Sequence, residues 1–190
     1  MIHGDESEAY DKFDELWECL QRREYAGRLT LEAIPNMNPD GLAIGSRFNA
    51  DGVDLNRNWP ASNFAPHRRR GHAPLSEPET RAVHRVIDER SPDLIVVFHS
   101  ASSGPFVDPD GPGEAAAEAF VEGARRTDPR WRVHADFTNP AGSLGSYAGL
   151  DLGIPTLTIE FRRGQSSDSA HEAAKSGLRV LFENLVNSNR

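Results

Sequence analysis

The chain has 190 residues, a formal net charge of −8 and an ordinary apolar content, with hydrophobic residues making up 37%. A chain of this length buries about 70% of its unfolded surface, so we expect residues 1–190 to form one domain. The acidic balance excludes the basic surface that nucleic-acid binding needs, and no apolar run approaches the roughly 20 residues that span a bilayer. Cys19 is the single cysteine, so no intrachain disulfide can form.

The first part of the chain combines one predicted helix and one predicted strand with long loops. Apolar residues at helical spacing predict an amphipathic helix over residues 6–23. Residues 28–34 alternate polar and apolar side chains like a half-buried strand, which Pro35 closes. Two Asp-Gly pairs favour a loop over residues 36–58, and Pro, His, Arg and Gly extend it to residue 75.

The remainder of the chain alternates helices with strands. Ser76 opens a helix with capping-box spacing to Glu79. The elements expected after it are strand 94–99, helix 113–126, strand 131–134, short helix 143–150, strand 155–161 and helix 169–187. This alternation predicts an α/β fold with helices on both sides of a largely parallel sheet.

Three residues are candidates for a metal site. His3 and Glu6 stand three apart where the first predicted helix begins, and His99 ends a buried strand, where α/β sheets usually place their sites. Two imidazoles and one carboxylate are the ligand set of a catalytic zinc, which leaves a fourth position for water. On its own, however, His-x-x-Glu is a weak signal, and surface residues or a helix-start charge explain it better.

Two further features carry chemistry and also have a plain structural explanation. The stretch from Asp54 to Pro60 places the forked guanidinium of Arg57 beside an amide in a loop, which suits bidentate binding of a carboxylate. A turn with a solvated Arg57 is the alternative. Glu160 lies inside an otherwise apolar strand, where an inward carboxylate is costly unless it is paired. An edge-strand residue that faces water is the alternative there.

Six motifs occur in a characteristic order along the chain. They are His3-Gly4-Asp5-Glu6, Asn38-Pro39-Asp40-Gly41, Arg47 ahead of the stretch from Asn49 to Asn58, Ser76-Glu77-Pro78-Glu79-Thr80, Phe98-His99-Ser100 and Thr158-Ile159-Glu160-Phe161. In these motifs the chain resembles the zinc metallocarboxypeptidase family of the carboxypeptidase A type over nearly its whole length. Residues 142–147 and the short loops are most similar to the bacterial murein peptide amidase branch of that family.

The resemblance implies a three-layer α/β/α sandwich with a mixed sheet, a metal site and a general base. His3, Glu6 and His99 would bind one zinc ion per chain. Asp54 would hydrogen-bond a ligand histidine, most simply His3, and fix its tautomer. Glu160 would take a proton from the attacking water and hand it to the leaving nitrogen.

The resemblance also implies how a substrate is held. Arg47 would polarise the scissile carbonyl and stabilise its oxyanion. Asn56 and Arg57 would hold the free carboxylate of the leaving amino acid. Digestive members of the family carry a mobile Tyr where alignment places Phe137. Tyr147 is a candidate to replace that phenol, and a residue of the substrate-pocket wall or of the packing is the simpler interpretation.

We therefore expect a zinc-dependent hydrolase that cleaves an amide bond next to a free carboxylate in a small peptide. The leading substrate is the γ-D-glutamyl–meso-diaminopimelate bond of murein peptides, which implies a cytoplasmic location. A general metallocarboxypeptidase or an N-acyl amino acid deacylase keeps the chemistry and changes the substrate. No acid stands at positions 144–145, so a pocket like that of enzymes preferring Lys or Arg is not expected.

The beginning of the chain departs from the family pattern. The family's sheet starts with strands ahead of the His-x-x-Glu motif, whereas here the first ligand is already His3. We therefore expect an N-terminally truncated sheet with an unpaired edge. The alternative of another class is a truncated, non-catalytic relative, which a low zinc content would reveal.

Overall fold

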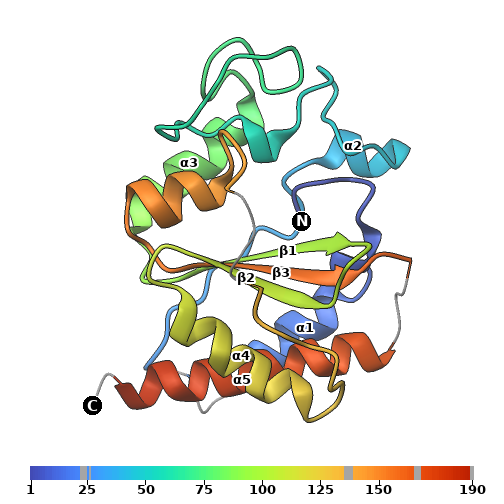
Figure 1. Ribbon diagram of the computed structural model, residues 1–190, viewed down its shortest axis with the longest axis vertical. Coiled ribbons are helices and arrows are strands. Elements are labelled where there is room, and N and C mark those ends of the chain that lie inside the picture. Colours follow the sequence, from blue (N-terminus) through green and yellow to red (C-terminus); the bar gives the residue numbers. More distant parts are fainter. Residues whose placement is uncertain (22–24, 26, 135–138, 165–167, 189–190) are drawn as a thin grey trace.

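A three-stranded mixed sheet forms the centre of the protein in the computed structural model (Figure 1). The described residues are 1–21, 25, 27–134, 139–164 and 168–188. The strands are β1 (Ile95–Ala101), β2 (Phe106–Asp110) and β3 (Thr156–Arg162). Their order is β1-β3-β2, with β1 parallel and β2 antiparallel to β3.

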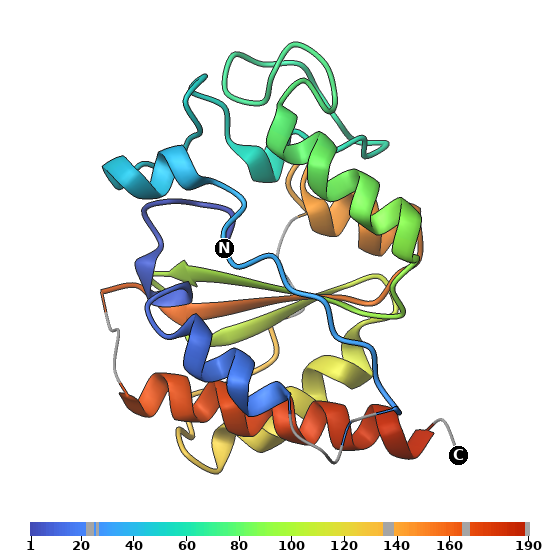
Figure 2. The same ribbon diagram turned by 180° about the vertical axis from the view of Figure 1, so that it is seen from behind.

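Helices cover both faces of this sheet, as the front and back views show (Figures 1 and 2). On one side lie α1 (Phe13–Leu20), α4 (Glu114–Arg125) and α5 (Asp168–Ser188), with α4 packed along α5. On the other side lie α3 (Pro78–Arg90) and the π-helix η4 (Gly145–Asp151). The predicted three-layer α/β/α sandwich is thus confirmed.

The two faces of the sheet carry different side chains, because successive residues of a strand point to opposite sides. Val107 and Ile159 belong to the larger core, which they share with α4 and α5. Ile95 and Val97 pack against a second core on the opposite face. The sheet is therefore apolar on both faces, as the middle layer of a sandwich must be.

The predicted helix over residues 6–23 is shorter in the structure. Ser7–Ala9 form only a 3₁₀ turn, η1, and the regular helix begins at Phe13. Glu8 turns inward instead of following a helical surface, because it accepts hydrogen bonds from Ser100 Oγ at 2.9 Å and from Gly164 N at 2.6 Å. These tertiary bonds outweigh the helical spacing at this end. Residues 22–24, at the other end, lie outside the described part of the chain.

Two predicted strands are wrong, and one strand was missed. Within residues 28–34 only Leu29 and Leu31 pack against a core, Ile34 is exposed, and the segment joins no ladder among the described residues. Within residues 131–134 only Val133 forms a bridge, to Val107. The missed strand is β2, whose Pro109 suggests a turn; it is tolerated there because β2 is an edge strand. Periodicity indicates which side chains face a core, whereas a strand also needs a neighbouring strand with which its backbone can form hydrogen bonds.

The long loop predicted after residue 35 contains short helices. Asn38 caps α2 (Pro39–Ile44), since its Oδ1 accepts a hydrogen bond from Gly41 N at 2.9 Å. A second 3₁₀ turn, η3, spans Leu55–Arg57 and follows Asp54. Both helices are too short to produce a periodic apolar pattern, so sequence analysis could not detect them.

The start of α3 also differs from the prediction. Glu77 is its N-cap residue and makes no side-chain capping bond, so the predicted capping box is wrong. Ser76 Oγ donates instead to Glu77 Oε1 at 2.6 Å.

Among the described residues, no helix is long and apolar enough to cross a membrane.

Candidate metal centre and active site

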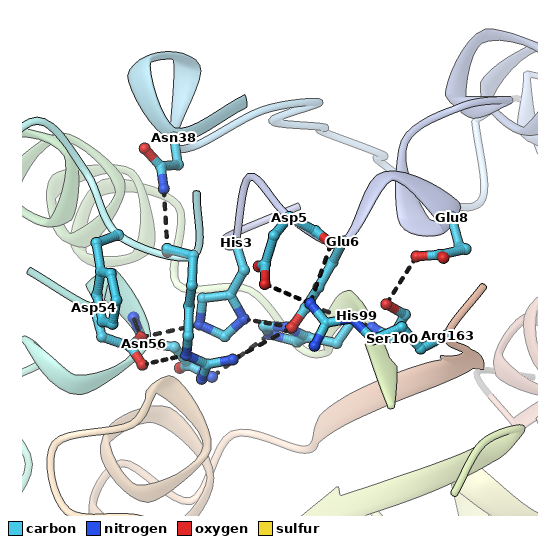
Figure 3. A network of polar contacts seen from close by, with 12 residues as sticks. His3, Asp5, Glu6, Glu8, Asn38, Asp54, Asn56, His99, Ser100 and Arg163 are labelled. Atoms are coloured by element: carbon cyan, nitrogen blue, oxygen red, sulfur yellow. Dashed lines mark hydrogen bonds and ion pairs between the residues drawn. The ribbon is translucent and has the colours of Figure 1, made fainter. Parts of the chain in front are cut away.

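His3, Glu6 and His99 converge in the folded chain. Glu6 Oε1 lies 2.9 Å from His3 Nδ1, and Glu6 Oε2 lies 2.7 Å from His99 Nδ1 (Figure 3). One ligand atom from each of the three residues lies within 4.8 Å of the other two. The three residues are buried, with exposed fractions of 2%, 3% and 3%. Both imidazoles therefore turn the same ring nitrogen towards one carboxylate.

The two histidines of the cluster lie on different elements, one on a strand and the other in an irregular segment. His99 lies on β1, and its partner in the β1–β3 register is Glu160. His3 lies in an irregular segment that docks against α2, where a Cβ atom on Gly4 would lie 2.0 Å from Gly41 C. This close approach explains why both sequence motifs contain glycine.

Asp54 lies behind His3 and links three groups of the site. Its Oδ1 lies 2.9 Å from His3 Nε2 and accepts a hydrogen bond from Asn56 N at 3.0 Å. Its Oδ2 accepts one from Arg47 Nε at 2.8 Å. The Nε2 atom of His3 is therefore turned to Asp54, and its Nδ1 atom is the one that lies on the side of Glu6.

The electrostatics favour ionised carboxylates in this cluster. Burial alone would raise the pKa of Glu6, but its contacts with His3 and His99 outweigh burial and hold that pKa far below its usual range. The pKa of Asp54 is also well below its usual range, because the bond to His3 and the nearby Arg47 outweigh burial. Burial lowers the pKa of His99 to about 4, so this ring is neutral at physiological pH, as a metal ligand must be.

The donor set fits zinc. Two imidazole nitrogens and one carboxylate converge, and Asp54 provides the outer carboxylate that commonly orients a metal-binding histidine. Among the described residues, no other group of three or more His, Cys, Asp or Glu side chains has comparable geometry.

Glu160 stands next to this cluster on β3. Its Oε2 atom is buried and has no hydrogen-bond partner among the described residues. Burial, and then the negative charge of Glu6, raise the pKa of Glu160 to about 7. The residue therefore does not face water at a sheet edge, which was the alternative from sequence; β3 is the central strand.

Asn56 and Arg57 lie beside the ligands on η3. Asn56 Nδ2 is 3.5 Å from His99 Nε2, and its Oδ1 accepts a hydrogen bond from Leu144 N at 2.9 Å. Arg57 Nη1 donates to the carbonyl oxygen of Asn56 at 2.7 Å. Arg47 reaches the ligands too, with Nη1 3.4 Å from Glu6 Oε1. Three polar or cationic side chains therefore border the metal cluster.

The structure does not bring the Tyr147 hydroxyl to this cluster. That hydroxyl lies 2.9 Å from His84 Nε2 on α3, and the Tyr147 ring stacks on Trp59 with centroids 6.0 Å apart. Tyr147 thus has the contacts of a packing residue. Phe137 lies outside the described residues.

Sequence analysis overlooked two acidic side chains on β2, Asp108 and Asp110. They occupy the same face of the sheet as Glu160, because Phe106, two residues before Asp108, pairs with Glu160 in the β2–β3 register. The Asp-Pro-Asp-Gly sequence of residues 108–111 is typical of a turn, and only its two-residue acidic spacing could have indicated a strand with both acids on one face.

A buried His-Glu-His cluster at the edge of an α/β sheet, with a carboxylate beside it, defines the class of metal-dependent hydrolases. Comparison with known proteins narrows this class. The family described as zinc carboxypeptidase matches residues 21–167. Murein peptide amidase A of Escherichia coli K12 is 35% identical over 191 residues, covering 90% of this chain and 72% of the relative. Its counterpart in Vibrio campbellii is 32% identical over 174 residues, covering 83% and 65%.

Comparison with solved structures leads to the same family. The murein-tripeptide amidase of Escherichia coli O157 aligns with a TM-score of 0.69 and 27% identity, covering 95% of this chain and 77% of that one. A metallo-carboxypeptidase from Burkholderia cenocepacia gives a TM-score of 0.72 and 25% identity, covering 99% and 55%. The chain belongs to the zinc carboxypeptidase family and is a hydrolytic enzyme of its peptidase and amidase class. His3 and Glu6 precede the matched range, so their assignment depends on the geometry above.

Proposed function

We propose that this chain binds one zinc ion through His3, Glu6 and His99 and hydrolyses an amide bond next to a free carboxylate in a small peptide. The observation that carries the proposal is the convergence of both Nδ1 atoms on Glu6, with the unpaired carboxylate of Glu160 on the adjacent strand. Zinc at this site would supply Lewis-acid chemistry, polarising a carbonyl oxygen and making water a nucleophile at neutral pH.

Glu160 is the proposed general base. Its free Oε2 atom can accept the proton of the attacking water and then deliver it to the nitrogen of the leaving amino acid. This assignment leaves the ligand set complete without Glu160, since Glu6 already provides the carboxylate. Surrounding apolar residues, such as Ile159 and Phe161 on the same strand, hold β3 in place.

The proposed substrate-binding groups are cationic and polar. Arg47 lies close enough to Glu6 to face a substrate carbonyl at the metal and to stabilise the negative charge that develops on it. Asn56 and Arg57 would hold the terminal carboxylate of the leaving amino acid. Two guanidinium groups in a protein of net charge −8 favour a small anionic substrate at this point.

The proposed substrate is a murein peptide, cleaved between γ-D-glutamate and meso-diaminopimelate, and the proposed compartment is the cytoplasm. The similarity to the E. coli and Vibrio murein peptide amidases supports this choice of substrate. A general metallocarboxypeptidase is the second candidate, supported by the similarity to the Burkholderia enzyme.

The test is a zinc measurement combined with a cleavage assay. The purified chain should contain about one zinc ion and release diaminopimelate from L-Ala-γ-D-Glu-meso-diaminopimelate, and Glu160→Gln should abolish release while retaining zinc. Zinc without release, together with cleavage of ordinary C-terminal peptide bonds, would favour the general carboxypeptidase. A chain that neither binds zinc nor cleaves any of these peptides would contradict the proposed function and favour a non-catalytic relative.

A further inference from the structure

Glu8 is a buried acidic residue that the proposed chemistry does not use. It is 7% exposed and lies in the 3₁₀ turn η1, two residues after Glu6. A buried carboxylate is costly unless its oxygens are paired. Ser100 Oγ, on β1, donates to Glu8 Oε2 at 2.9 Å, and Gly164 N, just after β3, donates to Oε1 at 2.6 Å. Glu8 therefore ties η1 to the ends of two neighbouring strands.

Ser100 connects Glu8 to the carboxylate of Glu6. The Ser100 N–H donates to Glu6 Oε2 at 3.3 Å, and the same oxygen lies 2.7 Å from His99 Nδ1 (Figure 3). This N–H is available because β1 is an edge strand, on which every second N–H points away from the sheet. The N–H of Ile95 is used towards β3, so that of Ser100, five residues further on, points to the open side.

These contacts form a closed ring of residues. The ring runs along the backbone from Glu6 to Glu8, across the hydrogen bond to Ser100 Oγ, and back to Glu6 through the Ser100 N–H. The backbone of Glu8 is held as well, because its carbonyl oxygen lies 3.1 Å from His171 Nε2 of α5. Such a ring restricts the torsions of Glu6 and fixes its carboxylate relative to His99, the neighbour of Ser100 on β1.

A second contact holds the same segment, but it is exposed to solvent. Arg163 Nη2 donates to the carbonyl oxygen of Asp5 at 3.1 Å and to Asp5 Oδ2 at 2.5 Å, and the two side chains are 41% and 29% exposed. Exposed ion pairs contribute little, because water screens them and long side chains lose entropy. We therefore expect the buried contacts of Glu8 to hold Glu6 more firmly than this pair does.

We propose that Glu8 is a positioning residue for zinc binding: through Ser100, it holds the carboxylate of Glu6 where the two imidazoles meet it. This proposal rests on the proposed function, because it takes Glu6 to be a zinc ligand. Glu8 acts through the hydrogen bonds of Ser100 and takes no part in the chemistry itself. Loss of an outer hydrogen-bonding residue typically weakens metal binding by about 10- to 100-fold.

Two variants of Glu8 separate the loss of its hydrogen bonds from the loss of its charge. Glu8→Leu removes both acceptors at a similar volume. Glu8→Gln can keep both contacts, because its oxygen can accept from Gly164 N while its amide donates to Ser100 Oγ. In competition with a chelator of known affinity, Glu8→Leu should bind zinc about 10-fold more weakly, and Glu8→Gln should stay within about 2-fold of the native chain. The controls are Glu18→Leu on the exposed side of α1 and Arg163→Gln, and both should leave the affinity unchanged.

A double-mutant cycle tests whether Glu8 acts through Ser100. Ser100→Ala removes the hydroxyl that contacts Glu8 and keeps the backbone N–H that contacts Glu6. This variant alone should lose about as much zinc affinity as Glu8→Leu, which keeps the proposal testable if Glu8→Leu does not fold. The double variant should lose little more, because both changes break the same contact. Additive losses, native affinity in either single variant, or equal losses in Glu8→Gln and Glu8→Leu would overturn the proposal.

Hydrogen exchange of the metal-free chain separates this proposal from the proposed function. The Ser100 amide should exchange on the order of 10-fold faster in Glu8→Leu than in the native chain, while the Ile95 amide keeps its rate as an internal reference. Faster exchange at Ser100 in a chain that binds no zinc would support the positioning of Glu6 by Glu8 and contradict the proposed function. Zinc binding and cleavage, together with unchanged exchange at Ser100 in Glu8→Leu, would retain the proposed function and refute the positioning role.

Discussion

The metal cluster joins two regions that are held in place in different ways. His99 and the adjacent Glu160 lie on β1 and β3, where the backbone register fixes their relative positions. His3 and Glu6 lie on a segment without a sheet or a long helix, and its position depends on the side chain of Asp54 and on the contact of Gly4 with α2. We therefore expect the strand half to tolerate changes in its surroundings, whereas the N-terminal half depends on a few individual contacts.

The largest expected effect is a loss of catalysis when Glu160 of the strand half is changed, with zinc binding kept. Glu160→Gln should lower kcat by about 10²- to 10⁴-fold, because the amide cannot accept the proton of the attacking water. Zinc content should stay at that of the native chain, since Glu160 is not one of the converging ligands. Steady-state kinetics and metal analysis measure both quantities, and Glu118→Gln, an exposed residue of α4, is the matched control. Loss of zinc along with activity would place Glu160 in the ligand set.

The next largest effect is expected in the N-terminal half, at the contact between Asp54 and His3. Asp54→Asn should weaken zinc binding by about 10- to 100-fold, because His3 loses the charged acceptor that orients its ring. Competition with a chelator of known affinity measures the change, and Asp51→Asn in the neighbouring exposed turn is the control. An unchanged affinity would show that the N-terminal segment is held by other contacts.

A smaller effect is expected from the backbone contact that supports the same segment. Gly4→Ala should lower the free energy of unfolding by about 1–3 kcal/mol, because the added methyl group would overlap the backbone of Gly41. Amide hydrogen exchange should show faster exchange near residue 4 and unchanged protection in β1 and β3. Equal loss of protection in the strands would contradict the separation into two regions.

The smallest expected effect is on the pH dependence of stability, and it comes from Asp108 on β2. An acid whose pKa is raised in the folded state destabilises the fold when it ionises, so the cost of Asp108 is absent below about pH 4 and complete above about pH 7. Asp108→Asn should therefore be more stable than the native chain at pH 8, by about 1 kcal/mol, and equally stable at pH 4. Urea unfolding at both pH values measures this difference. A variant that is less stable at pH 8 would show that Asp108 has a structural partner.

Sequence motifs led directly to the members of the site that lie within or next to distinctive local patterns. Glu160 interrupts an apolar strand and His99 ends one, so each stands out in the sequence, and the resemblance to a family then implied its role. Asp54 and Asn56 belong to a motif rich in turn-forming residues, and the structure places both beside the ligands. Tyr147 has no such local signal; its hydroxyl position depends on His84 of α3, which is far away in the sequence.

The limits of the sequence are clearest at the strands. Residues 28–34 have the alternation of a strand but no ladder in the described part of the chain, and β2 has a ladder but an acidic, proline-containing sequence. Ladder formation depends on which neighbour is available, so alternation alone cannot decide it. The same dependence hid the position of Asp110 beside Gly145.

From local periodicity, the sequence predicted the α/β alternation of this protein. The candidate ligands His3, Glu6 and His99 and the base candidate Glu160 followed from the resemblance of six ordered motifs to a family, since the spacing of these residues alone is a weak signal. The tertiary structure was needed to show that both Nδ1 atoms face one carboxylate and that Asp108 and Asp110 lie along the same face of the sheet. Such distances arise from strand register and from packing between remote segments, which local periodicity does not encode.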